Sequence, residues 1–414
     1  MRLDQLRAAF FHGERKRMRT VGIVCEYNPF HSGHAYQIEQ IRKQMSDAVI
    51  VCLMSGHATQ RGELAIADRY TRAAMAIAGG ANVVLELPYP YSAASAAYFA
   101  GAGVAILDSL GVQGLSFGCE CTDLMLLHRA ASMTRTEEFW ACVRDRQKGG
   151  EGSAAAYFSE LQARLADSDY CFLANDILAL EYMRSMLAIE SDMQPMPIHR
   201  DGSAYRAQKT EDGKHPSATA LRKLLLQCDN EALSLMPVSA KNVLENAISN
   251  GLAPGDMKQL DAAILSFFRL QEPTALAQSA EMQGGLSNRL HDAAMRACSV
   301  EEMLTLASSK SYPTARLRRA ILYAMTGVTG TDLTTSPAYV SLLSADAVGR
   351  ELLRYWKGSN TPIPIVTKPA DAFGISLIAS RQASLSLTLD ALFALTLPRV
   401  CSADRFVKMS PRMF

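Results

Sequence analysis

The sequence predicts an α/β fold in which a parallel β-sheet is covered by helices on both faces. Apolar runs of strand length recur along the first half of the chain, and helical patterns separate the first four of them. The expected strands are 21–25, 48–53, 82–87, 113–117 and 193–198, and the expected helices are 68–78, 92–110, 123–134 and 175–188. In open sheets of this type, ligands lie at the carboxyl ends of the strands.

The end of the first strand is the most informative part of the sequence. The apolar run at 21–25 is broken by an Asn-Pro pair at 28–29, and apolar residues then recur at helical spacing from 38 to 45. Gly33 and His34 therefore lie where a helix is expected to begin.

This turn has the features of a phosphate site, because a helix N-terminus presents unpaired N–H groups and a partial positive charge. Gly33 allows close approach of the backbone, while His31 and His34 add donors for charge that develops on an α-phosphate and a leaving pyrophosphate. The pattern favours nucleotidyl transfer, and the chain has no G-x-x-x-x-G-K-[ST] motif. Paired histidines are also common as solvated or packed side chains. A metal site is less favoured, since no cluster of further ligands accompanies the pair.

Other segments are expected at the same edge of the sheet. Loop 55–63 follows the second strand and carries Gln60, Arg61 and Glu63. Such a loop can hold a small acid or gate a pocket, although a solvated loop is the alternative. Asn175 opens a helix and Arg200 ends the fifth strand, so both can reach a nucleotide bound across the sheet.

A further helix is expected to begin at Ser217, with Thr219 and Arg222 in its first turns. The hydroxyl groups suit an N-terminal cap, and the arginine suits a second phosphate contact. Ordinary capping is the more common use of the two hydroxyl groups.

The segment 310–319 is the densest basic stretch beyond the first 17 residues. Its candidate RNA-binding residues are Lys310, Tyr312, Arg316, Arg318 and Arg319. Cationic side chains with an aromatic ring available for stacking fit an RNA backbone. Charge runs are, however, more often simply exposed helix faces.

Composition and pattern divide the 414 residues into four parts. Residues 1–18 form a polar and basic extension, and 19–230 form the nucleotide-binding domain. Residues 231–330 are predicted to be a mainly helical domain, and 331–414 a small mixed part.

Net charge, cysteine distribution and hydropathy exclude some classes of protein. A net charge of +1 excludes a globally basic nucleic-acid binder but allows a local basic patch. The nine cysteines are dispersed and form no Cys-x-x-Cys motif, which predicts reduced thiols. We find no secretory signal and no apolar run long enough to span a bilayer, so we expect a cytoplasmic protein without a membrane partner.

Eight blocks of the sequence resemble a known enzyme family and occur in the same order. These blocks are 22–34, 54–57, 60–63, 85–88, 117–118, 175–178, 217–222 and 312–319. The chain is similar to the bacterial tRNA(Met) cytidine acetate ligases from about residue 20 to 370. The resemblance implies a Rossmann-like parallel sheet of the nucleotidyltransferase superfamily.

The resemblance also implies the reaction. Such an enzyme activates acetate with ATP, releases pyrophosphate, and passes the acetyl group from acetyl-adenylate to N4 of the wobble cytidine of elongator tRNA(Met). It implies catalysis by His31 and His34, and Mg²⁺ is expected only because ATP usually carries it. By matching position, the ATP site is expected to comprise Val24, Cys25, Glu26, Tyr27, Asn28, Pro29, Phe30, His31, Ser32, Gly33, His34, Gly118, Asn175 and Arg200. The expected second phosphate contact adds Ser217, Thr219 and Arg222.

The chain departs from the family pattern at four positions. Leu64 and Cys119 stand where relatives more often have proline and serine, and Gly284 and Ser287 stand where they have glutamates. Two alternatives stay open: an adenylyltransferase acting on a phosphorylated small molecule, and a non-catalytic RNA-binding protein on the same fold.

Overall fold

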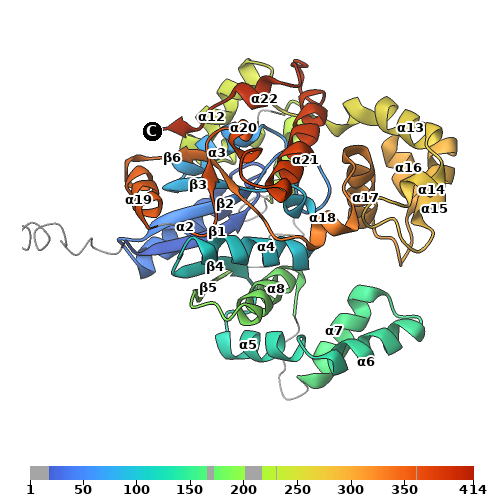
Figure 1. Ribbon diagram of the computed structural model, residues 1–414, viewed down its shortest axis with the longest axis horizontal. Helices are drawn as coiled ribbons and strands as arrows, with labels where there is room; N and C mark the ends of the chain where they lie inside the picture. Colours follow the sequence, from blue (N-terminus) through green and yellow to red (C-terminus); the bar gives the residue numbers. More distant parts are fainter. Residues whose placement is uncertain (1–17, 166–171, 201–216, 230, 360) are drawn as a thin grey trace, which may run out of the picture.

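The computed structural model describes residues 18–165, 172–200, 217–229, 231–359 and 361–414 (Figure 1). Within them lies an eight-stranded sheet in the order β5-β4-β1-β2-β3-β6-β7, with β8 paired to β6. Its strands are β1 (Thr20–Cys25), β2 (Val49–Ser55), β3 (Val83–Leu87), β4 (Gly114–Cys119), β5 (Gln194–His199), β6 (Val340–Ala345), β7 (Ile365–Val366) and β8 (Arg412–Met413). The predicted extension, except for Met18, lies outside the described residues.

The predicted parallel sheet is confirmed. Strands β1 to β5 begin and end within two residues of the expected positions, and every pairing among them is parallel. Strand β1 lies between β4 and β2, so the carboxyl ends of these strands share one edge of the sheet. This edge carries the segments that the sequence analysis selected.

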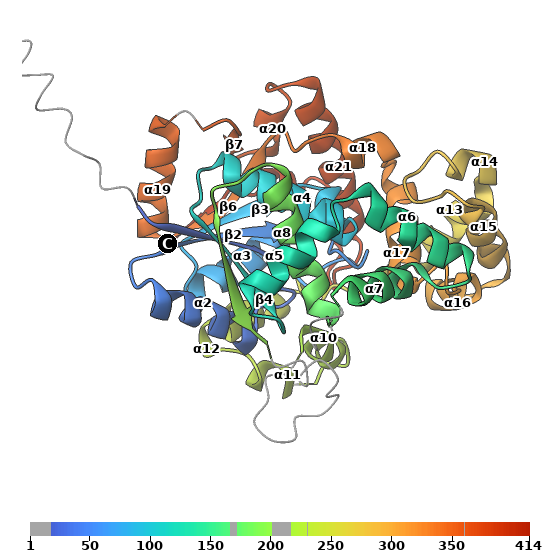
Figure 2. The same ribbon diagram turned by 90° about the horizontal axis from the view of Figure 1, so that it is seen from below.

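Helices cover both faces of the sheet (Figures 1 and 2). One face packs against α4 (Ala96–Ser109), α8 (Ala174–Ala188) and α19 (Ala347–Gly358), and the other against α2 (Ser32–Gln44), α3 (Arg69–Ala78), α10 (Ala218–Leu226) and α12 (Val238–Ser249). All seven residues of β2 are buried. A continuous apolar run of this kind is typical of a central parallel strand whose two faces are both covered.

The remaining elements lie around this core. They are η1 (Tyr91–Ala93), α5 (Leu124–Met133), α6 (Glu137–Lys148), α7 (Ser153–Arg164), α11 (Glu231–Ser234), η2 (Met257–Leu260), α13 (Asp261–Leu270), α14 (Pro273–Leu276), α15 (Leu286–Arg296), α16 (Val300–Ala307), α17 (Thr314–Thr326), α18 (Gly330–Thr334), α20 (Pro369–Ala372), α21 (Leu377–Ala394) and α22 (Arg405–Lys408). Among the described residues, no helix is both long and apolar enough to cross a bilayer.

Packing divides the chain differently from the boundaries predicted at residues 231 and 331. Helices α11 and α12 bury Ala232, Leu244 and their neighbours in the core of the sheet, so the separate helical core begins only near η2. The last part of the chain holds both strands and helices, and its strand β6 pairs antiparallel with β3 and extends the same sheet. Helix α21 packs into the helical core, which ties the two regions together.

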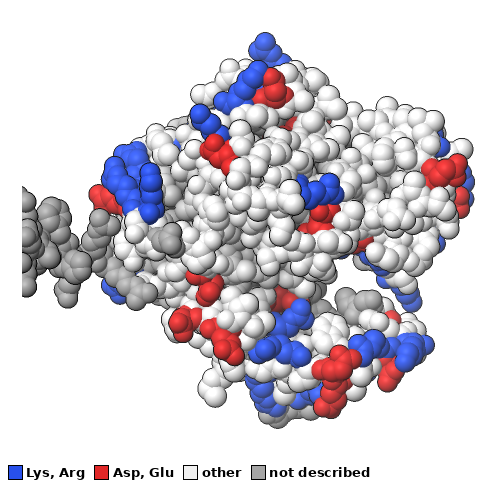
Figure 3. Space-filling model, viewed as in Figure 1, with Lys and Arg blue, Asp and Glu red and all other residues white. Residues whose placement is uncertain are grey.

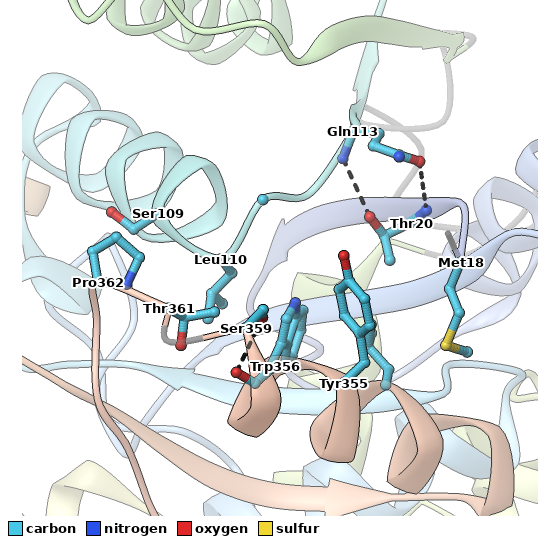
Figure 4. A pocket seen from close by; sticks show the side chains of 12 residues that line it. Met18, Thr20, Ser109, Leu110, Gln113, Tyr355, Trp356, Ser359, Thr361 and Pro362 are labelled. Carbon is cyan, nitrogen blue, oxygen red and sulfur yellow. Dashed lines mark hydrogen bonds between the residues drawn. The ribbon is translucent and has the colours of Figure 1, made fainter. Parts of the chain in front are cut away.

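The amino edge of the sheet lies away from the candidate site. A hollow of about 210 Å³ opens there, between Thr20 and Gln113 on one side and Tyr355 and Trp356 of α19 on the other (Figure 4). Figure 3 shows basic side chains gathered on α19, whereas charges of both signs mix over α6 and α7. Neither the hollow nor the basic side chains of α19 lie next to the turn that carries His31 and His34, which we call the histidine turn.

Arg72 on α3 joins the carboxyl ends of β1 and β2. The side chain is fully buried. Its Nη1 donates to the carbonyl oxygen of Glu26 at 2.6 Å, and Nη2 donates to those of Ser55, at 3.0 Å, and Gly56. Its Nε donates to the carbonyl oxygen of Ala67 at 3.0 Å. One guanidinium therefore satisfies the buried acceptors at both strand ends.

We expect Arg72→Met to lower the free energy of unfolding by more than about 2 kcal/mol, because buried carbonyl oxygens lose their donors while most of the side-chain volume is kept. Urea denaturation measures this change. The control is Arg144→Ala, which removes an exposed arginine paired with Glu137 and is expected to change stability by less than about 0.5 kcal/mol. Equal unfolding midpoints for the two variants would contradict the prediction.

Candidate active site

The turn after β1 is built on two buried aromatic side chains. Tyr27 and Phe30 are 1% and 0% exposed, and their ring centroids lie 4.9 Å apart. Phe30 packs so closely against Gly79 that a Cβ there would lie 2.3 Å from the ring. Tyr27 has a φ of 44°, which reverses the chain before α2. The turn is thus fixed in shape, and α2 begins at Ser32, as the sequence predicted.

His31 and His34 cap the first turn of α2 reciprocally. The N–H of Gly33 donates to Nδ1 of His31 at 3.0 Å, and the N–H of His31 donates to Nδ1 of His34 at 3.2 Å. The two rings stack with their centroids 3.7 Å apart. A Cβ at position 33 would lie 2.9 Å from the His31 ring, so glycine is needed there. The pair has the geometry of a capping box built from two imidazoles.

Arg200 brings a positive charge to this turn. Its N–H donates to the carbonyl oxygen of Cys119 at 2.8 Å, and its side chain crosses Gly118, where a Cβ would lie 2.4 Å from it. Burial lowers the pKa of His34 well below its usual range, and the positive character of His31 and Arg200 adds to the effect. His34 is therefore uncharged at neutral pH.

Asn175 reaches the same edge through the loop that follows β4. Its Nδ2 donates to Oε1 of Glu120 at 2.7 Å. The adjacent Asp176 is buried and accepts from the N–H groups of Glu120, Cys121 and Leu173 at 3.0, 2.8 and 2.8 Å. Asp176 thus fixes the start of α8 to the end of β4. The sequence analysis did not single out Asp176, although it stands beside Asn175 in one of the resembling blocks.

The predicted substrate loop forms a small hairpin, 58–64, beside the histidine turn. The N–H of Gln60 donates to Oε1 of Glu26 at 2.8 Å, and the N–H of Ile66 donates to Oδ1 of Asn28 at 2.8 Å. The loop and the turn are therefore held together at two points. These contacts do not fit the alternative that the loop is simply exposed to solvent.

Glu26 is a buried carboxyl group at this junction. Burial raises its pKa, and the Gln60 N–H, Arg222 and Arg61 act in the opposite direction by stabilising the carboxylate. Residues of the predicted substrate loop and of α10 thus lie around one carboxyl group of the turn.

Helix α10 carries the residues predicted as a second phosphate contact, Ser217, Thr219 and Arg222. Ser217 is its N-cap and accepts a backbone N–H of the first turn at 3.2 Å, as ordinary capping requires. Arg222 reaches back across the site. It donates from Nη1 to the carbonyl oxygen of Asn28 at 2.9 Å, and from Nη2 to Oε2 of Glu63 and Oγ1 of Thr219, each at 3.3 Å.

Four buried polar atoms at this edge lack a protein partner within the described part of the chain. They are Asn28 Nδ2, Ser32 Oγ, Gln60 Nε2 and Glu120 Oε2. Buried polar atoms are normally hydrogen-bonded, and exceptions gather where a ligand or water completes the bonding. These four atoms can therefore bind a ligand or water.

The basic stretch lies on the helical region rather than at the histidine turn. Lys310 is exposed. The hydroxyl of Tyr312 donates to the carbonyl oxygen of Gly284, and the guanidinium carbon of Arg316 lies 5.0 Å from the centroid of the Tyr312 ring. Gly284 has a φ of 74°, so this departure from the family pattern stands where glycine is favoured.

The other two arginines of the stretch have carboxylate partners inside the protein. Arg318 pairs with Glu63 of the hairpin, and Arg319 pairs with Glu281 at 2.8 Å. The structure therefore joins Arg318 to the predicted substrate loop, a contact that was not predicted from the sequence.

A buried polar cluster at the base of the hairpin was also missed. Nδ1 of His57 and Nη1 of Arg69 contact Oδ1 of Asp390 at 2.7 and 2.6 Å, and the His57 ring stacks on Phe393 with the centroids 4.1 Å apart. Burial lowers the pKa of His57, although Asp390 opposes this effect. Asp390 lies on α21, more than 300 residues along the chain, so no local pattern could have indicated the contact.

No group of three or more His, Cys, Asp or Glu side chains is placed to hold a metal ion in the part of the chain that the structure describes.

Comparisons with known proteins identify the family of the chain. A family model described as HIGH Nucleotidyl Transferase matches residues 18–405. A tRNA(Met) cytidine acetate ligase of Clostridium perfringens is 32% identical over 378 residues, which cover 87% of this chain and 92% of the relative. One from Syntrophotalea carbinolica is 35% identical over 349 residues, covering 81% of this chain and 82% of the relative.

Solved structures show the same fold. The crystal structure of Thermotoga maritima TmcAL in its apo form matches with a TM-score of 0.89 and 27% identity, covering 96% of this chain and 100% of that one. The structure of TmcAL bound with alpha-thio ATP matches with a TM-score of 0.87, the same identity and the same coverage. The chain belongs to the HIGH nucleotidyl transferase family and, within it, to the tRNA(Met) cytidine acetate ligases.

Proposed function

We propose that this protein activates acetate with ATP and transfers the acetyl group to N4 of the wobble cytidine of elongator tRNA(Met), giving N4-acetylcytidine. Membership of the family makes it an ATP-dependent tRNA-modifying ligase. The observation that carries the proposal is the reciprocal cap of His31 and His34 at the start of α2, on the edge where β1, β4 and β5 end.

In the first step, an acetate oxygen bonds to the α-phosphorus of ATP and the bond to pyrophosphate breaks. Negative charge develops on the phosphate oxygens, and the N-terminus of α2 presents a partial positive charge to them. Because a backbone N–H can only donate, Nδ1 of each histidine must accept, and in a neutral ring the hydrogen then lies on Nε2. Both rings thus act as Nε2–H donors, while Arg200 supplies charge.

In the second step, N4 of the cytidine attacks the acetyl carbon, the bond between the acetyl group and AMP breaks, and N4 loses one proton. Acetate is a poor acyl donor until one of its oxygens is bonded to AMP, which makes that oxygen part of a good leaving group. The enzyme then contributes mainly by positioning the two reactants and stabilising charge. ATP binding is proposed for the residues of the turn together with Gly118, Asn175, Arg200, Ser217, Thr219 and Arg222, with Mg²⁺ entering as the counter-ion of ATP.

RNA binding is proposed for the exposed side of the basic stretch. Lys310 and the stacked pair of Arg316 and Tyr312 lie at or near the surface, where they can meet a phosphate backbone. Arg318 and Arg319 also belong to the stretch, but each already has a carboxylate partner.

The direct test is incubation of the protein with ATP, labelled acetate and bulk tRNA, followed by digestion of the RNA. We expect labelled N4-acetylcytidine that appears only when ATP and acetate are both present. Pyrophosphate release that requires a phosphorylated small molecule, and not acetate, would instead support an adenylyltransferase. Tight tRNA binding without ATP turnover would support a non-catalytic RNA-binding protein.

We expect His34→Ala to slow acetate-dependent ATP–pyrophosphate exchange by about 10²–10³-fold, because one donor to the developing charge is lost. His128→Ala is the matched control, since His128 is exposed on α5. Exchange at the wild-type rate in His34→Ala would contradict the assigned role.

The protonation of the pair is testable without substrate. We expect long-range ¹H–¹⁵N NMR spectra to show His34 as the Nε2–H tautomer, still uncharged at pH 6.5, where an ordinary imidazole is half protonated. The sign follows from burial and from the neighbouring positive groups, which both disfavour the charged ring. An imidazolium signal from His34 at this pH would refute the donor geometry.

A further inference from the structure

We propose that Glu63 is a positioning residue that couples the helical region to the nucleotide turn, so that Arg318 supports ATP binding even when no RNA is present. The inference rests on the proposed function, because it identifies the nucleotide turn as the ATP site. It assigns to one arginine of the basic stretch a role other than RNA contact.

The coupling is a continuous chain of contacts. Arg318 of α17 pairs with Oε1 of Glu63, and Oε2 of Glu63 accepts from Arg222 at 3.3 Å. Arg222 in turn donates to the carbonyl oxygen of Asn28 at 2.9 Å, three residues before His31. One carboxylate therefore links the helical region to the turn that carries the histidines.

The backbone of the hairpin also lies directly against α17. Gly62 has a φ of 72°, and a Cβ at this position would lie 2.5 Å from the backbone nitrogen of Arg319. Gln60, two residues earlier, donates its N–H to Glu26. The hairpin is thus held between α17 and the nucleotide turn, and its shape depends on both.

Charge explains why Glu63 matters more than an ordinary surface carboxylate. Its side chain is 23% exposed, and those of Arg222 and Arg318 are 17% and 35% exposed. The three residues line one cavity of about 700 Å³ between the two regions. Without this carboxylate, Arg222 and Arg318 would lose the direct partner that they share, and the repulsion between their guanidinium groups would displace Arg222 from Asn28.

The experiment compares ATP affinity in wild type, Arg318→Ala, Glu63→Gln and the double variant, by calorimetry without RNA or acetate. We expect each single variant to raise the dissociation constant for ATP by about tenfold, and the double variant to bind no more weakly than the weaker single variant. Arg318→Lys, which keeps the charge, is expected to recover part of the affinity. Arg296→Ala, which removes an exposed arginine of α15, is the control and is expected to bind ATP normally.

The outcomes separate coupling from simple unfolding and from an error in the function. Thermal unfolding is followed for each variant. Partial recovery of ATP affinity in Arg318→Lys excludes unfolding as the cause of the loss in Arg318→Ala. Wild-type ATP affinity in Arg318→Ala would overturn the coupling. Additive losses of ATP-binding free energy, in which the double variant shows the sum of the two single losses, would also overturn it. ATP affinity does not depend on which acid is used, so a failure of acetate activation would contradict the proposed function without deciding the coupling.

Discussion

The site depends on one buried cation. Arg72 lies beneath the edge where β1 and β2 end, and burial lowers its pKa to about 10, which leaves it protonated at neutral pH. A guanidinium offers five N–H groups in a fixed plane, so one side chain can bind the four carbonyl oxygens around it at once, whereas a lysine has only three donors. The histidine turn follows one of these strand ends and the hairpin follows the other. Their relative position is therefore set before any ligand binds.

A second buried contact explains why the last part of the chain belongs to the same unit. His57 at the base of the hairpin and Arg69 at the start of α3 share one oxygen of Asp390 on α21. Burial alone would raise the pKa of Asp390, but Arg69 and His57 lower it, so the carboxylate stays charged. A buried charge that loses its partner is costly. The hairpin therefore holds α21 in place, and β6 completes the sheet beside β3.

The sequence predicts those parts of the site that have a local signal. Apolar runs reveal the central strands, and the Asn-Pro break followed by Gly33 indicates the helix start at Ser32. Arg72 and Asp176 were not predicted, because their side chains lie in helices and most of the backbone groups that they bind belong to other elements. The antiparallel pairing of β6 with β3 joins residues more than 250 positions apart, which no periodicity can indicate. The sequence predicts the elements, and long-range polar contacts decide how they meet.

In the basic stretch, the role of each arginine depends on its interaction partners and not only on its place in the charge pattern. Successive residues of a helix point about 100° apart, so arginines close in sequence face different surroundings. Arg316 stacks on Tyr312, whereas Arg318 faces the hairpin. An RNA phosphate near Arg318 would compete with Glu63, which in turn holds Arg222. Linkage then requires reciprocity: any factor by which RNA binding changes the affinity for ATP must equal the factor by which ATP changes the affinity for RNA.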